Sequence, residues 1–243
     1  ATDCDTIPPE PGYVLVIDQT RGDASVRASR GDRARFLEML TEARQAHPGT
    51  RILIKTHPET TAGHRQGHYT EQDTAPGVEI FDRPLSPWLL LDGAVAVYTL
   101  SSQMGFEAIL AGHRPRVFGT PFYAGWGLTE DETGLPRRAR VLTRAQLTAA
   151  AMILYPKWYD PYRDRLCPVE DVLSALEAQT RARREDRDGW VGQGMRLWKR
   201  GTLQRTFGQH RRMRFAEAPR SVSLAQATGR SRMVWASKAA PDD

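Results

Sequence analysis

Short apolar runs alternate with stretches of helical periodicity between residues 13 and 155. The apolar runs predict strands at 13–18, 51–55, 78–81, 93–98, 116–118 and 140–142. Apolar residues spaced along one helical face predict helices at 33–45, 103–111, 143–154 and 168–184. Because alternating strands and helices form βαβ units with right-handed crossovers, we expect helices on both faces of a parallel sheet. The pattern predicts an α/β fold with a Rossmann-like sheet.

The periodicity weakens after Glu177, where only a helix at 194–207 and a strand at 232–235 without an evident partner are predicted. Residues 181–243 hold 15 Lys and Arg against 6 Asp and Glu, a net charge of +9, whereas residues 1–180 have a net charge of −4. This asymmetry indicates an α/β domain at 13–180 and a basic, mostly helical or irregular segment at 181–243. Such a segment is either a solvated helical face or a surface that docks on another domain, an anionic membrane or a polyanion.

The composition is that of an ordinary soluble globular protein, with 40% hydrophobic and 26% charged residues. No run approaches the roughly 18 apolar residues that a membrane-spanning helix needs, and we expect no signal peptide at the N-terminus. The two cysteines, Cys4 and Cys167, lie far apart without metal-ligand spacing, which is typical of a reducing cytoplasm.

A polar loop follows the first strand directly, from Asp18 to Ser25. It contains two carboxylates, Asp18 and Asp23, but a single glycine, so it is neither a P-loop nor a dinucleotide fingerprint. A carboxylate at such a strand end could act as a base or nucleophile, or could cap the next helix. The sequence leaves both interpretations open.

The second strand also ends in groups suited to a phosphate. His57 could donate to a phosphate or act as an acid, or could simply hydrogen-bond the backbone of a turn. Lys55 is either a phosphate counter-charge or a strand-end side chain that reaches solvent. His64 and His68 follow, but no carboxylate or cysteine pattern completes a metal site, and we expect none.

A third group of polar residues opens the predicted helix at 103–111. Ser101, Ser102 and Gln103 lie where backbone N–H groups and the helix dipole favour an anion, although serines are also ordinary helix caps. Glu107 could bind sugar hydroxyls or complement the dipole. The loop at 121–129, with Tyr123 and Trp126, suits a sugar or a base if exposed, and is core if buried.

Five motifs in this order resemble one known family: Asp-Gln-Thr-x-Gly-Asp-Ala-Ser, Lys-x-His-Pro, Thr-Leu-Ser-Ser-Gln-x-Gly-Phe-Glu-Ala, Phe-Gly-x-Pro-Phe-Tyr-Ala-Gly-Trp-Gly-Leu-Thr and Ile-Leu-Tyr-Pro. The family is that of the KpsC/LipB-type capsule polysaccharide proteins, β-Kdo glycosyltransferases that use CMP-Kdo. The resemblance implies the C-terminal, nucleotide-binding half of a GT-B-like enzyme. It also implies a linker at 1–12, the start of a following module within 181–243, and a sequence that is a piece of a longer protein.

Carried onto this chain, the resemblance implies that Asp23 is the nucleophile of a retaining double displacement, with Asp18 as a rival. His57 and Lys55 would stabilise the CMP phosphate. Ser101 and Ser102 would hold that phosphate at the helix start. The remaining implied substrate contacts are Gln103, Glu107 at the ribose, Tyr123 and Trp126. Neither a metal nor a cofactor is implied.

The implied acceptor is a lipid-linked glycan at the cytoplasmic face of the inner membrane. An anionic membrane surface or capsule assembly proteins are further implied partners, and nucleic acid is not. Three alternatives remain open at this point: a fragment that binds a nucleotide sugar without turnover, a GT-B enzyme with another nucleotide sugar, and an interaction arm carrying relic motifs.

Overall fold

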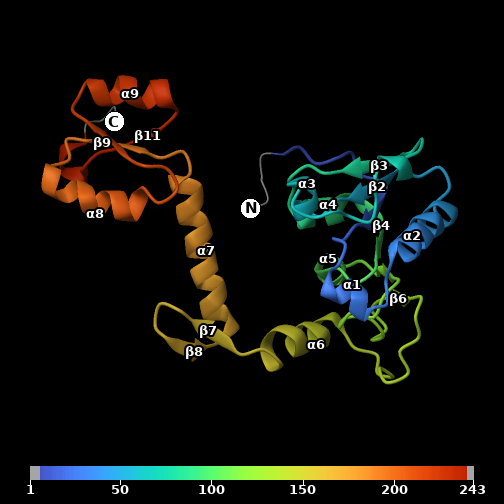
Figure 1. Cartoon of the computed structure of the whole chain (residues 1–243). Helices are drawn as coiled ribbons and strands as arrows, with labels where there is room; N and C mark the ends of the chain where they lie inside the picture. The colour runs from blue at the N-terminus through green and yellow to red at the C-terminus, as the bar shows by residue number, and fades with distance from the viewer. Residues whose placement is uncertain (1–5, 240–243) are drawn as a thin grey trace. The chain divides into compact units, whose positions relative to one another are not determined.

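The computed structural model describes residues 6–239, so Cys4 and the first five residues of the predicted linker lie outside the described part. Contacts within the chain divide it into two compact units, Ala1–Leu154 and Tyr155–Asp243 (Figure 1). This division precedes residue 180, where the sequence places the end of the nucleotide-binding domain. The functional extent of that domain stays a prediction.

The first unit is built on a six-stranded parallel sheet, which confirms the predicted α/β fold. The strand order is β3-β2-β1-β4-β5-β6. The strands are β1 (Tyr13–Ile17), β2 (Ile52–Lys55), β3 (Val78–Phe81), β4 (Ala94–Thr99), β5 (Arg116–Val117) and β6 (Glu130–Asp131). The two strands that follow β1 in the chain lie on one side of it and the last three lie on the other.

Helices cover both faces of this sheet. The central strand β1 is fully buried, and its alternate side chains point to opposite faces. Val14 and Val16 pack with α2 (Arg33–Ala46), while Leu15 and Ile17 pack with α4 (Pro87–Gly93) and α5 (Gln103–Ala111). Each such side chain contributes about 1.5–3 kcal/mol on burial. The core therefore holds the strand ends in fixed positions.

Four short helical segments in the loops of the first unit were not predicted. They are α1 (Ala24–Ala28), α3 (Pro58–Thr61), the 3₁₀ turn η1 (Glu71–Asp73) and α4 (Pro87–Gly93). Asp23 and His57 cap α1 and α3 through their side chains. Helices of this length carry no periodicity, so their caps are the only local signal.

The prediction of a sixth strand at 140–142 is wrong. Val141 is 81% exposed, and β6 forms instead at Glu130–Asp131 by pairing with β5. The helix predicted at 143–154 is present, but only α6 (Arg144–Thr148) is α-helical, and a π-helix, η2 (Ala149–Leu154), continues it. The helix at 168–184 is confirmed as α7 (Val169–Asp186).

The second unit contains more ordered structure than the sequence predicts. β7 (Trp158–Asp160) and β8 (Arg165–Cys167) form an antiparallel hairpin before α7. A parallel sheet of order β10-β9-β11 follows, with β9 (Trp190–Gln193), β10 (Arg214–Ala216) and β11 (Ser231–Met233). The helices α8 (Leu197–Phe207) and α9 (Arg220–Thr228) connect these strands, and the 3₁₀ turn η3 (Ala236–Lys238) follows them. The strand predicted near 232 is confirmed, but the expectation that it lacks a partner is wrong, because β11 pairs with β9.

None of the helices among the described residues is long and apolar enough to cross a membrane.

Candidate functional site

A groove of about 380 Å³ lies between the carboxyl ends of β1 and β4. This is the point in the large sheet where successive strands stop being added on one side of β1 and are added on the other. In open α/β sheets, such a switch point is where ligands bind. The loops after β1, β2, β4 and β5 each contribute to its lining. The lining residues are Gln19, Asp23, Ser25, His57, Ser101, Ser102, Gln103, Pro121, Phe122 and Tyr123.

The side-chain amide of Gln19 joins two walls of this groove. Its Nε2 donates to Ser25 Oγ at 3.3 Å and to Ser101 Oγ at 3.2 Å, while its Oε1 accepts from the Ser101 N–H at 2.9 Å. Ser25 Oγ and Ser101 Oγ are themselves 3.1 Å apart. Gln19 is only 4% exposed, so its buried amide holds the two serines in place. Their hydroxyls lie in the lining of the groove.

Asp23 is held as an ionised carboxylate at the edge of this network. Its Oδ1 accepts from both the backbone N–H and the Oγ of Ser25, each at 2.7 Å. Partial burial pushes the pKa of Asp23 upward, but these hydrogen bonds, one from the Val26 N–H and the charge of Arg65 outweigh it, so the pKa lies below its ordinary value. Asp23 can therefore cap α1 and also act as a base or nucleophile, because the hydrogen bonds of the cap keep its carboxylate charged.

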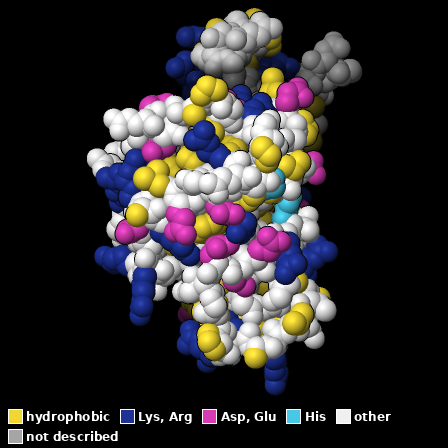
Figure 2. Space-filling view, turned by 90° about the vertical axis from the view of Figure 1, so that its right-hand side faces the viewer, with side chains coloured by type: hydrophobic (Ala, Val, Ile, Leu, Met, Phe, Trp, Pro, Cys, Tyr) yellow, Lys and Arg dark blue, Asp and Glu magenta, His cyan; other side chains and the backbone are white. Residues whose placement is uncertain are grey.

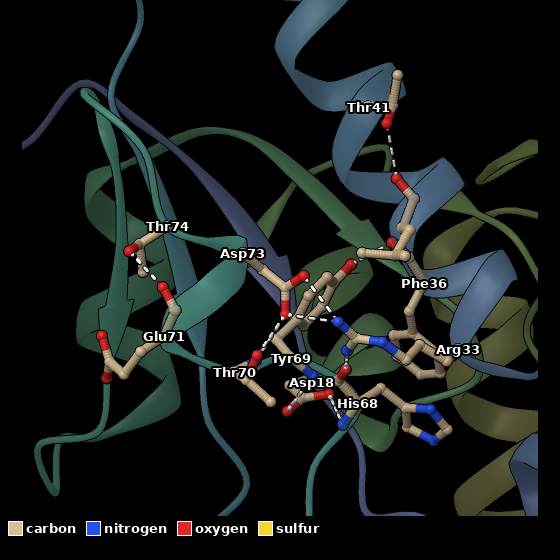
Figure 3. Close-up of polar contacts among 11 residues, drawn as sticks. Asp18, Arg33, Phe36, Thr41, His68, Tyr69, Thr70, Glu71, Asp73 and Thr74 are labelled. Carbon is tan, nitrogen blue, oxygen red and sulfur yellow. Dashed lines mark hydrogen bonds and ion pairs between the residues drawn. The ribbon is translucent and has the colours of Figure 1, made fainter.

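Asp18 lies in a different environment and does not line the groove. Its carboxylate is 3% exposed and accepts backbone N–H groups of Gln19 at 2.8 Å and His68 at 3.0 Å, with Tyr69 at 3.5 Å. Figure 3 shows how Asp18 meets the segment that carries His68 and Tyr69. Gly67 is needed there, because a Cβ at that position would lie 2.1 Å from Asp18 Oδ2. Asp18 thus supports the loop instead of facing a ligand.

The same segment is held from its other side by α2. Arg33 at the start of this helix donates to the His68 carbonyl and pairs with Asp73 at 2.9 Å, as Figure 3 shows. The Tyr69 hydroxyl donates to the Phe36 carbonyl at 2.5 Å, and the Phe36 ring stacks on His68 at 4.1 Å. His68 is therefore part of the packing beside α2.

Burial of Asp18 predicts a specific pH dependence of stability. Desolvation raises the pKa of Asp18 to about 6. The backbone N–H donors and the charge of Arg21 lower this pKa, but their effect is smaller. Between about pH 4 and 6 the folded state therefore binds more protons at this site than the unfolded state. Its stabilising contribution is present at low pH and is lost as the pH rises to 6, by about 3 kcal/mol.

We expect Asp18→Asn to remove this dependence. Relative to the wild type, the free energy of unfolding of the variant should rise by about 3 kcal/mol between pH 4 and pH 7. Urea denaturation at a series of pH values measures it. A difference between the two proteins that does not change with pH would show that the carboxyl of Asp18 titrates normally.

The two residues from β2 are placed differently. His57 lines the groove, and its Nδ1 accepts the Glu59 N–H at 3.2 Å, so a neutral ring carries its proton on Nε2. Lys55 does not line the groove. Its Nζ donates to the Thr56 carbonyl at 3.0 Å and lies over the Phe81 ring, and burial lowers its pKa.

The start of α5 forms the opposite wall. Ser102 caps this helix by accepting the Met104 N–H at 3.2 Å, and both Ser102 and Gln103 line the groove. Glu107 lies one turn further along, half-buried and outside the lining, and desolvation raises its pKa. Ser102 and Gln103 at the helix start therefore face the groove, whereas the role predicted for Glu107 at a ribose stays a prediction.

The aromatic loop after β5 closes the groove beside α5. Tyr123 is fully buried, and its hydroxyl donates to the Ser102 carbonyl at 2.6 Å. Phe122 is 45% exposed and lines the groove. Trp126 does not line it, and its Nε1 donates to the Phe122 carbonyl at 2.7 Å. Phe122 is thus the aromatic side chain that this loop offers to a ligand.

Sequence reasoning did not single out four of the groove residues, which are Gln19, Ser25, Pro121 and Phe122. All four belong to loops that it did identify, and the contacts between loops distinguish them. Among residues 6–239, no group of three or more His, Cys, Asp or Glu side chains is placed to hold a metal ion.

Comparison with solved structures shows where this fold occurs. The chain is similar to two structures of Thermosulfurimonas dismutans KpsC. The β-Kdo 2,4 transferase matches with 38% identity and a TM-score of 0.66 over 72% of this chain and 54% of that one. The β-Kdo 2,7 transferase matches with 29% identity and a TM-score of 0.60 over 72% and 57%.

Curated relatives match more than half of the chain. The capsule polysaccharide modification protein LipA of Neisseria meningitidis serogroup B is 34% identical over 82% of this chain and 29% of its own length. The lipopolysaccharide-processing protein LpsZ of Rhizobium meliloti is 36% identical over 60% of this chain and 33% of its own length. The chain thus spans about a third of these relatives. The sequence profile of the capsule polysaccharide biosynthesis protein family matches residues 2–157, and the chain belongs to this family.

Proposed function

We propose that the chain is the nucleotide-binding half of a retaining GT-B glycosyltransferase that transfers Kdo from CMP-Kdo in capsule biosynthesis. The observation that carries this proposal is the convergence of Asp23, His57 and the start of α5 on one groove. The likeness to two Kdo transferase structures supports it. The acceptor-side half of the enzyme would close the groove.

The groove suits a single phosphate. The dipole of α5 favours an anion at the start of this helix. The Ser101 hydroxyl and the His57 Nε2 proton add donors from the neighbouring loops. No Lys or Arg is among the described residues that line the groove. CMP carries one phosphate, so these neutral donors suffice for it, while the two phosphates of UDP would lack a matching cation.

Asp23 would act as the nucleophile. In the proposed reaction, its carboxylate oxygen forms a bond to the anomeric carbon of Kdo while the bond to the CMP phosphate breaks, and CMP leaves with the electron pair. The oxygen of an acceptor hydroxyl then bonds to the anomeric carbon, the bond to the Asp23 carboxylate breaks, and the hydroxyl proton passes to water. Two inversions give net retention. Asp23 lines the groove, whereas Asp18 is buried and does not line it, and this difference supports the assignment.

The other substrate contacts complete the proposal. Gln103 would touch the nucleotide or orient Glu107, Glu107 would bind the ribose, and Phe122 would cover the base or sugar beside Tyr123. Trp126 would act through Phe122. The acceptor would be a lipid-linked glycan at the cytoplasmic face of the inner membrane. A nucleotide-binding fragment without turnover of its own is the second candidate, because the chain covers just over half of each transferase structure.

Calorimetry with CMP and UDP tests the donor class. We expect CMP to bind more tightly than UDP, and Ser101→Ala to weaken CMP binding about 10- to 100-fold, as the loss of one hydrogen bond to a charged phosphate would. The melting temperature should change little.

Ser174→Ala provides the matched control, because Ser174 lies on α7 and its hydroxyl donates only to the Glu170 carbonyl at 2.9 Å. This variant should bind CMP as the wild type does. Tighter binding of UDP would reject CMP-Kdo as the donor. Equal CMP affinity in Ser101→Ala and the wild type would remove the groove as the phosphate site.

A further inference from the structure

Three arginines gather at the amino ends of the strands in the small parallel sheet. Arg214 begins β10, Arg211 lies in the turn before it, and Arg230 directly precedes β11. Gly189 precedes β9, the central strand of this sheet. Because the strands run parallel, these positions share one edge, opposite the carboxyl ends.

Two of these arginines pack tightly around Gly189. Arg211 Nη1 donates to the Asp188 carbonyl at 2.9 Å, and Arg230 Nη1 donates to the Arg212 carbonyl at 2.9 Å. A Cβ at Gly189 would lie 2.5 Å from Arg230 Nη1 and 3.1 Å from Arg211 Cβ, and its φ of +74° also favours glycine. The backbone thus fixes both guanidinium groups.

Among the described residues, no ion pair joins Arg211, Arg214 or Arg230 to a carboxylate. Burial lowers the pKa of Arg230, and the charges of Arg211 and Arg214 lower it further. The two acidic residues just before Gly189 have other partners, since Asp186 accepts from Trp190 Nε1 at 2.6 Å and Asp188 pairs with Arg187 at 3.7 Å.

A buried donor also lacks a partner at this edge. The Nε of Arg230 is buried and makes no hydrogen bond to any described residue. On the face drawn in Figure 2, Lys and Arg side chains lie among Asp and Glu side chains. Gathering three guanidinium groups in this way is unfavourable unless an anion joins them.

We propose that Arg211, Arg214 and Arg230 form a binding site for a phosphate group, named here the arginine cluster. A guanidinium presents several N–H donors in a planar arrangement that matches phosphate oxygens. A group of three cations favours a multiply charged oxyanion over a single carboxylate. The arginine cluster lies in the second unit and shares no residue with the groove of the first unit. The proposal therefore does not depend on the proposed transfer reaction.

The phosphate could belong to a soluble phosphoester or to a phospholipid headgroup. Arg211 and Arg214 are exposed, so either source can reach them. Soluble pyrophosphate and vesicles of phosphatidylcholine with phosphatidic acid represent the two sources. Vesicles of phosphatidylcholine alone supply the uncharged reference surface.

The test compares two double variants of the full chain that lose the same charge. Arg211→Gln with Arg214→Gln removes the exposed part of the arginine cluster and leaves Arg230 in place. Arg205→Gln with Arg220→Gln removes two other exposed arginines of the same unit. Circular dichroism checks that both fold, and the single variant Arg214→Gln replaces the first if it does not.

We expect the cluster variant to bind at least about tenfold more weakly than the control variant, which should bind nearly as the wild type does. Loss confined to pyrophosphate assigns a soluble phosphoester, and loss at the vesicles assigns a lipid headgroup. Absence of binding to both probes, or an equal loss in both double variants, would overturn the proposal. Binding of pyrophosphate that the cluster variant retains in full would also overturn it, because it would then arise at another site.

Discussion

Asp23→Asn should abolish the proposed transfer of Kdo, assayed in a protein that joins this chain to the proposed acceptor-side half. We expect turnover to fall at least about a thousandfold, or about 4 kcal/mol of transition-state stabilisation. The physical reason is that an amide cannot form the proposed bond to the anomeric carbon, whereas the variant keeps an oxygen that can cap α1. Turnover measured with CMP-Kdo and intact mass analysis for a covalent adduct on the chain check the result.

Asp32→Asn separates the loss of a nucleophile from the loss of a cap. Asp32 caps α2 as Asp23 caps α1, accepting the Arg35 N–H at 2.9 Å, and it does not line the groove. This variant should retain full turnover. If Asp23→Asn instead remains active, or if an adduct still forms in it, Asp23 is not the nucleophile and the retaining mechanism proposed above fails.

Gly105→Ala should cause the largest loss of stability among small substitutions at the site. A Cβ there would lie 2.2 Å from Tyr123 Oη, 2.7 Å from Tyr123 Cζ and 2.8 Å from Thr99 Cγ2. Tyr123 is fully buried and donates to the Ser102 carbonyl, so its ring has no room to move. We expect the free energy of unfolding to fall by about 3 kcal/mol and the melting temperature by about 5–10 °C.

Gly201→Ala is the matched control, because Gly201 lies inside α8 and nothing stands within 4 Å of the position that a Cβ would take. Here alanine should stabilise the helix by up to about 1 kcal/mol. Chemical denaturation of both variants measures the difference. Equal effects of the two substitutions would show that the loop carrying Tyr123 adapts without cost.

The strands of the large sheet can be predicted because each central strand is a continuous apolar run that is buried on both faces. β6 cannot be predicted in this way. Glu130–Asp131 is polar and becomes a strand only through its pairing with β5, whereas the apolar Val141 remains exposed. Likewise, β11 has a partner only because α8 and α9 return the chain to β9.

The location of the site can also be predicted, because parallel strands bring the loops after β1, β2 and β4 to one edge. The direction of each side chain cannot. Lys55 turns to the Thr56 carbonyl, and Tyr123 is buried behind α5. The contact between Gln19 and Ser101 joins positions 82 residues apart, so no local pattern reveals it.

The amide of Gln19 also sets the direction of the hydrogen bonds that lead from it to Asp23. Because its Oε1 is occupied by the Ser101 N–H, its NH₂ group must face the two hydroxyls. Ser25 Oγ therefore accepts a hydrogen bond from Gln19 and donates its own proton to Asp23, which can only accept. The Ser101 hydroxyl lies 3.1 Å from Ser25 Oγ and 3.4 Å from Gln19 Oε1, both long hydrogen bonds, so it can turn to an arriving phosphate oxygen at the loss of one weak bond.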